Sequence, residues 1–177
     1  GFRTVSVPLV DDLLDEDNES FVVSINNAVG ATIIVGGGSV LILDDDPTPN
    51  ITITNLAVSE SAGIAQVQVV MSSMSSRIVT VNFTTTDDTA LQPADYATTA
   101  RILQWNPGET GARAVNVPIR DDLLDEPDET VKLTLSAATN ATAQVADGIL
   151  TILDDEPTPT LALADFVVDE DAGIATI

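Results

Sequence analysis

Alternation of apolar and polar residues along the chain predicts β-strands. In IVTVNFTT (78–85) every second residue is apolar, and the same period of two recurs in RAVNVPI (113–119) and VKLTLS (131–136). This period places one face of a strand in a core and the other in solvent. Further candidate strands are ITITNLAV (51–58), AQVQVVMS (65–72), ARILQW (100–105) and GILTIL (148–153). No stretch has the 3.6-residue period of an amphipathic helix.

About seven strands therefore fall within roughly 108 residues, separated by Gly, Pro, Asn and Asp. Short strands at this spacing are typical of an antiparallel β-sandwich of immunoglobulin-like size. The fold class that we expect is all-β.

The chain also repeats itself at a fixed offset of 110 in the numbering. Residues 1–67 and 111–177, aligned without a gap, are identical at 30 of 67 positions. VPLVDDLLDE returns as VPIRDDLLDE, ILDDDPTP as ILDDEPTP, and ESAGIA as EDAGIA. A fixed period of this length indicates a tandem array of domains, because it is too long for a solenoid repeat.

The two Pro-Thr-Pro segments set the expected boundaries of the repeats. Proline cannot continue a central strand and stiffens a linker. We therefore expect 1–49 to be the C-terminal part of one repeat, 50–157 to be a complete repeat, and 158–177 to be the first strands of a third.

The net charge and the absence of two residue types limit the partners and metal sites that this chain can have. The 177 residues include 28 Asp and Glu but only 6 Lys and Arg, for a net charge of −22, and there is no Cys or His. Nucleic acid and anionic membranes are disfavoured as partners, since both require basic residues, and no apolar run predicts direct membrane insertion. Without Cys or His, thiolate and imidazole metal sites are excluded. Divalent cations that prefer oxygen ligands fit the composition.

The carboxylates gather in two segments that follow predicted strands. One is DDLLDEPDE (121–129) and the other is DDE (154–156). Loops of a sandwich meet at its two ends, and Ca²⁺ takes six to eight oxygen ligands in irregular geometry. The alternative is a solvated acidic surface that keeps the protein soluble. The return of the same acids at an offset of 110 favours calcium. Glycosidase-like carboxylate pairs are disfavoured because aromatic residues are 3% of the chain, and we expect no enzyme activity.

These combined motifs resemble the Calx-β domain. A strand that ends in DD, the following DE.DE, the terminal ILDDE, VSESAGIA near the start and TALQPADY in the middle all carry the resemblance. It covers the complete repeat and both partial ones. The resemblance implies calcium as the cofactor, with carboxylate ligands and one backbone carbonyl, that of Leu124. Leu123 and Pro127 depart from the pattern of some members and reduce the number of ions expected.

The ligand set that the resemblance implies has three parts. In the complete repeat it comprises Glu60, Asp95, Asp121, Asp122, Leu124, Glu126, Glu129, Asp154, Asp155 and Glu156. In the first partial repeat it comprises Asp11, Asp12, Glu16, Glu19, Asp44, Asp45 and Asp46. In the third it comprises Glu170 alone.

We therefore expect a calcium-rigidified structural repeat of a long extracellular adhesin or surface fibre, located outside the cell or on the surface of a bacterium. Its partners would be neighbouring repeats of the same chain or same-type subunits in a filament, together with a cell-surface or matrix receptor. Two alternatives remain at this point: a regulatory calcium sensor of a membrane protein and a metal-free interaction scaffold.

Overall fold

The computed structural model describes residues 1–174, and its body is a sandwich of two β-sheets. One sheet contains, in spatial order, β10 (Gly111–Pro118), β6 (Ile64–Met71), β4 (Asn50–Ile53) and β12 (Thr142–Val145). The other contains β5 (Leu56–Ser59), β13 (Asp147–Leu153), β11 (Glu129–Thr139), β8 (Val79–Asp87) and β9 (Ala100–Trp105). The predicted all-β sandwich is confirmed.

The core lies between these sheets and follows the alternation in the sequence. Val79, Val81 and Phe83 of β8 are buried, while Thr80 and Asn82 between them are half-buried on the outer face. Trp105 closes one end of the core, and its Nε1 donates a hydrogen bond to the Gly111 carbonyl at 3.1 Å. Tyr96 is also fully buried, and its hydroxyl donates to Asp87 Oδ1 at 2.6 Å.

The stretch 51–58, predicted as one strand, forms two strands in different sheets. β4 pairs with β6, whereas β5 pairs with β13. The chain crosses between the sheets at Asn55, whose Oδ1 accepts the Ile149 N–H at 2.9 Å. Two pairs, β4 with β12 and β5 with β13, are parallel, so the sandwich is not antiparallel throughout.

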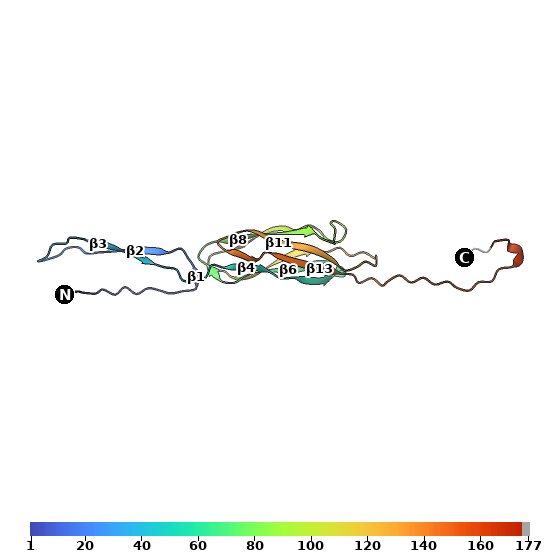
Figure 1. The fold of residues 1–177 in the computed structure, drawn as a ribbon, viewed down its shortest axis with the longest axis horizontal. Coiled ribbons are helices and arrows are strands. Elements are labelled where there is room, and N and C mark those ends of the chain that lie inside the picture. The colour runs from blue at the N-terminus through green and yellow to red at the C-terminus, as the bar shows by residue number, and fades with distance from the viewer. Residues whose placement is uncertain (175–177) are drawn as a thin grey trace.

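The first partial repeat forms a hairpin of β2 (Glu19–Ser24) and β3 (Gly37–Ile42) that extends away from one end of the sandwich (Figure 1). Its register repeats that of β11 and β13: Glu19 pairs with Ile42 as Glu129 pairs with Ile152, again at an offset of 110. The hairpin meets the sandwich where β1 (Leu14–Asp15) pairs in parallel with β7 (Met74–Ser75).

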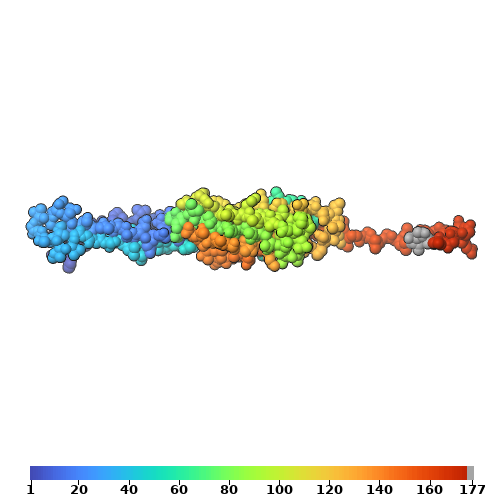
Figure 2. Space-filling view, turned by 90° about the horizontal axis from the view of Figure 1, so that it is seen from above, coloured from blue at the N-terminus to red at the C-terminus, as the bar shows by residue number. Residues whose placement is uncertain are grey.

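At the other end the chain continues beyond the sandwich as an extended segment (Figures 1 and 2). It ends in the short 3₁₀ helix η2 (Glu170–Ala172), which matches η1 (Glu60–Ala62) of the complete repeat. In the described part of the chain, no helix has the length and apolarity needed to cross a membrane.

Replacement of Phe83 by Ala tests the two-layer core. Phe83 is fully buried, so we expect a loss of about 3–5 kcal/mol in the free energy of unfolding, measured by urea titration followed by circular dichroism. Ile102→Ala is the matched control on the neighbouring β9, where the side chain is 73% exposed; a change within about 0.5 kcal/mol is expected there. Equal losses in both variants would contradict this core.

Candidate metal centre

The two acidic segments of the complete repeat lie together at one end of the sandwich. The loop between β10 and β11 meets the residues that follow β13. The Glu126 N–H donates to Asp154 Oδ1 at 3.0 Å, and the Asp154 N–H donates to Asp128 Oδ1 at 3.3 Å. The expectation that these loops gather at one end is confirmed.

A first group of four carboxylates forms where η1 approaches this end. Glu60, Asp121, Asp155 and Glu156 each offer an oxygen, and these oxygens lie within 4.8 Å of one another. Glu60 is placed by η1, which ends at Gly63 with a φ of +68°, a left-handed conformation that favours glycine. The Gly63 carbonyl accepts the Ile119 N–H at 2.9 Å, which ties η1 to the end of β10.

This first group contains two buried carboxylate oxygens without a hydrogen-bond partner. They are Glu60 Oε1 and Glu156 Oε2, and Glu60 is only 8% exposed. A buried charge without a partner is costly, and buried carboxylates are therefore paired with cations or coordinate metals. The orphaned oxygens are the observation that fits a bound cation at this position.

A second group lies beside the first. Asp95, Glu126 and Glu129 bring three carboxylate oxygens within 4.8 Å of one another. Asp95 is held in place because its Oδ2 accepts the Leu91 N–H at 2.6 Å, and its carbonyl accepts the Arg120 N–H at 2.8 Å.

Burial and the neighbouring acids raise the pKa of three carboxyls in these groups. Burial and the adjacent carboxylate of Glu156 raise the pKa of Glu60 to about 7, although the backbone N–H of Asp122 acts in the opposite direction. Burial, the hydrogen bond to Asp95 and the charge of Asp95 raise the pKa of Glu129 to about 7. Burial and nearby acids also raise the pKa of Glu126. Each shift is the cost of ionising a carboxylate without a cation beside it.

Other predicted ligands lie next to these groups. Asp122 Oδ1 accepts the Leu124 N–H at 2.7 Å, so Leu124 follows a tight turn in the same loop. Asp154 Oδ1 accepts a hydrogen bond from the Glu126 N–H, as described above. Glu170, in η2, is exposed and lies outside both groups.

Two residues that sequence reasoning missed hold the ligands in place. Ser61 Oγ donates a hydrogen bond to Asp155 Oδ2 at 2.8 Å, and Asp128 Oδ1 accepts one from the Asp154 N–H. The signal for Ser61 was its place in ESAGIA, directly after Glu60, within a segment that returns as EDAGIA in the third repeat.

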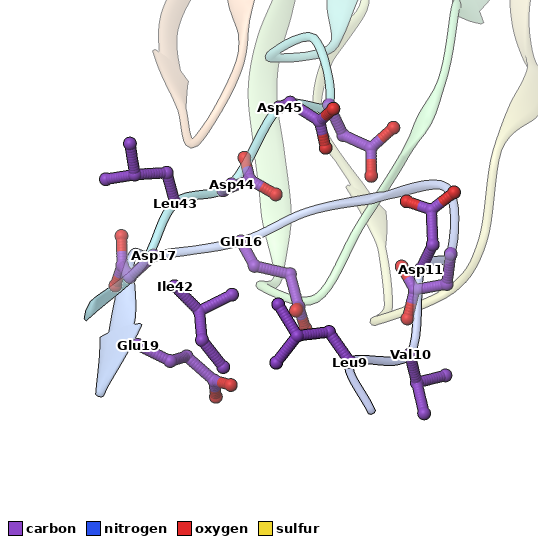
Figure 3. A pocket seen from close by; sticks show the side chains of 12 residues that line it. Leu9, Val10, Asp11, Glu16, Asp17, Glu19, Ile42, Leu43, Asp44 and Asp45 are labelled. Carbon is purple, nitrogen blue, oxygen red and sulfur yellow. The ribbon is translucent and has the colours of Figure 1, made fainter. Parts of the chain in front are cut away.

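In the first partial repeat, the predicted acids line a hollow beneath the hairpin (Figure 3). All seven border it, together with apolar residues such as Leu9, Val10 and Ile42. Burial and the neighbouring acids raise the pKa of Glu16 and of Asp46. In residues 1–174, carboxylates close enough to share one ion form only the two groups of the complete repeat.

The loop architecture of the first partial repeat nevertheless matches that of the complete one. The Leu14 N–H donates to Asp12 Oδ1 at 2.9 Å, as the Leu124 N–H does to Asp122. The Asp44 N–H donates to Asn18 Oδ1 at 2.9 Å, as the Asp154 N–H does to Asp128. The same sequence therefore builds the same loop twice.

The donor set decides which ion these groups suit. All candidate ligand atoms in the two groups are carboxylate oxygens from loops and from the ends of η1 and β11, and hard cations such as Ca²⁺ prefer oxygen ligands of this kind. Mg²⁺ demands a tighter octahedron and retains its waters. Fold and site together define a class: a β-sandwich module with clustered carboxylates, suited to a cation, at one end.

Comparison with known proteins gives the family. The sequence pattern of the Calx-β domain matches residues 1–46 and 43–156. The chain therefore belongs to the Calx-β domain family, whose members are calcium-binding modules.

Solved structures share the fold. The apo form of the Calx CBD1 domain matches with a TM-score of 0.57 at 23% identity, over 62% of this chain and 100% of its own. CBD12 from CALX1.2 matches with a TM-score of 0.57 at 24% identity, over 60% of this chain and 46% of its own. The Calx CBD2 domain matches with a TM-score of 0.53 at 16% identity, over 58% of this chain and 85% of its own. A search of curated proteins found no significant match.

Without calcium, stability should fall as pH rises toward neutrality. The folded state holds protons on Glu60 and Glu129, with pKa values near 7, that the unfolded chain releases from its ordinary pKa of 4.5 upward. Because the folded state binds more protons in this window, the free energy of unfolding decreases between about pH 4.5 and 7. Urea titrations in chelator at several pH values measure this slope.

The double variant Glu60→Gln/Glu129→Gln should flatten that slope, because neither amide titrates. Glu109→Gln is the control, since hydrogen bonds from Asn106 lower the pKa of Glu109 and it lies away from the site. A double variant with the slope of the unmodified chain would show that these two groups do not carry it.

Proposed function

We propose that this chain is a calcium-rigidified structural repeat of a long extracellular adhesin or surface fibre of a bacterium. The observation that carries the proposal is the pair of buried, unpartnered oxygens of Glu60 and Glu156 within a group of four carboxylates. Those residues, with Asp121 and Asp155, would hold one ion. Asp95, Glu126 and Glu129 would hold a second. Membership of the Calx-β family supports calcium as that ion.

A mechanical role fits the position of the site. Glu156 precedes Pro157, where the chain leaves the sandwich, and Thr158 Oγ1 donates to Asp125 Oδ1 at 3.4 Å. An ion bound here cancels carboxylate repulsion and orders the loop that faces the next repeat. The partners of this repeat would be neighbouring repeats or same-type subunits, and a cell-surface or matrix receptor would be the target of the fibre.

The expected affinity fits a structural rather than a regulatory use. Extracellular modules bind calcium with dissociation constants of about 10⁻⁴ to 10⁻³ M. At 2 mM Ca²⁺, roughly 2 to 20 times such dissociation constants, one bound ion stabilises the folded state by about 0.6–1.8 kcal/mol. Titration calorimetry that gave roughly micromolar affinity would instead favour a calcium sensor.

Asp121→Asn tests the metal centre directly. In the unmodified chain, 2 mM Ca²⁺ should raise the melting temperature by several degrees over chelator, about what 1–2 kcal/mol produces in a domain of this size. Mg²⁺ should raise it much less. The variant should lose most of the calcium-dependent shift, because it removes a charged ligand of the first group.

Asp147→Asn is the matched control, because Asp147 begins β13 whereas the metal site follows the end of that strand. It should retain the full calcium-dependent shift. If the unmodified chain melts at the same temperature and is equally flexible in X-ray scattering with calcium and with chelator, the acidic loops are solvated surface and the proposal fails.

A further inference from the structure

Where the first partial repeat meets the complete one, a buried carboxylate is held without any metal. Asp15 is 4% exposed, and its Oδ2 accepts hydrogen bonds from Arg77 at 2.5 Å and from Ser75 Oγ at 3.1 Å. Its Oδ1 accepts Thr48 Oγ1 at 3.1 Å. Its backbone carbonyl accepts the Ser76 N–H, also at 3.1 Å. Both carboxylate oxygens are thus satisfied by protein donors.

Arg77 makes this contact a clasp between repeats. Its guanidinium also pairs with Asp17 at 2.8 Å, so one arginine of the complete repeat holds two acids of the preceding one. Burial acts to raise the pKa of Asp15, but hydrogen bonds from Arg77, Ser75 and Thr48 outweigh it and lower the pKa. A charge-assisted, forked contact of this kind fixes orientation as well as distance.

Asp15 differs from the acids on either side of it in the chain. Asp12 and Glu16 border the acidic hollow of the first partial repeat, whereas Asp15 does not. The loop therefore divides its acids between the acidic hollow and the neighbouring repeat.

Part of this arrangement, the hydrogen bond from threonine to aspartate, recurs one repeat later. Asp125 corresponds to Asp15 and Thr158 to Thr48, and Thr158 Oγ1 donates to Asp125 Oδ1 as Thr48 Oγ1 does to Asp15 Oδ1. Asp125 is exposed, whereas Asp15, beside Arg77, is buried. Residues 158–174 repeat the start of the complete domain, up to a second 3₁₀ helix.

We propose that Asp125, oriented by Thr158, is the acceptor for an arginine of the following repeat at the position that matches Arg77. Successive repeats of this array would then be joined by an Asp–Arg clasp rather than by a shared metal ion. The occupant is a Ser-Ser-Arg segment like 75–77. Pro127 stands where the preceding loop has Asp17, so this second joint would contain one ion pair where the first contains two.

Distance measurements across the first joint test the clasp. The chain has no Cys, so spin labels attach only at two introduced cysteines. Val22 on β2 and Ile102 on β9 suit this purpose because they are 74% and 73% exposed. Electron–electron double resonance should give a single narrow distance peak, and Asp15→Asn or Arg77→Gln should broaden it to a wide distribution.

Arg113→Gln is the matched control, because Arg113 pairs with Glu109 within the complete repeat. It should leave the peak narrow. A narrow peak in both Asp15→Asn and Arg77→Gln would overturn the clasp. So would complete loss of the peak in chelator with Asp15 and Arg77 intact, because the joint would then depend on metal.

A lengthened chain tests Asp125 itself. Residues 158–177 correspond to 48–67, so a copy of residues 68–157 appended after Ile177 completes the third repeat. The added segment contains a second copy of Arg77. With labels at Ile102 and at its copy, the peak should be narrow, and Asp125→Asn should broaden it while Asp147→Asn does not. A peak that Asp125→Asn leaves narrow would overturn the assignment of Asp125, provided that circular dichroism shows the added repeat to be folded.

Discussion

Desolvation of carboxylates at the end of the sandwich is the constraint on which the rest of this structure depends. The fold brings the loop after β10, the residues after β13 and the helix η1 to one place, and each contributes acids. A carboxylate that loses water must gain a cation, a proton or hydrogen-bond donors. Glu60 and Glu156 have neither a donor nor a basic side chain for their buried oxygens. Burial raises the pKa of Glu60 and of Glu129 to about 7, and a divalent cation is a partner that suits the clustered carboxylates.

The chain satisfies the same constraint in two chemically different ways. Within the repeat, several acids converge and leave room for an ion. Between repeats, a single acid, Asp15, is surrounded by donors from Arg77, Ser75 and Thr48. A cation bound within the repeat would exchange with solvent, so its occupancy would follow the calcium concentration. Arg77 is part of the chain and cannot dissociate into solvent, and its guanidinium stays charged at any physiological pH. The planar guanidinium also fixes the geometry of the joint.

Much of this arrangement was predictable from the sequence because it rests on local patterns or on repetition. Strict alternation identified β8, and the return of acids at an offset of 110 marked both loops. The crossing at Asn55 was missed although the alternation changes phase there: the apolar residues are Ile51 and Ile53 before it and Leu56 and Val58 after it, with two polar residues between. The division of the acids into two groups depends on which oxygens meet in space. The contact between Arg77 and Asp15 had no signal either: they are 62 residues apart, and the part of the repeat that contains Arg77 occurs once in the chain, so repetition could not mark it.

The two devices are coupled because they share one loop. In the segment 121–129, the ligands Asp121, Glu126 and Glu129 flank Asp125, and Thr158 follows the terminal acids by two residues. An ion that fixes those ligands also restricts the positions that Asp125 can take. If Asp125 is already restricted before an arginine docks, less conformational entropy is lost on docking. The joint is then more stable without any new interaction. Calcium would then stiffen the array without bridging two repeats: it would order the surface on which the clasp forms, and the clasp would set the angle between neighbours.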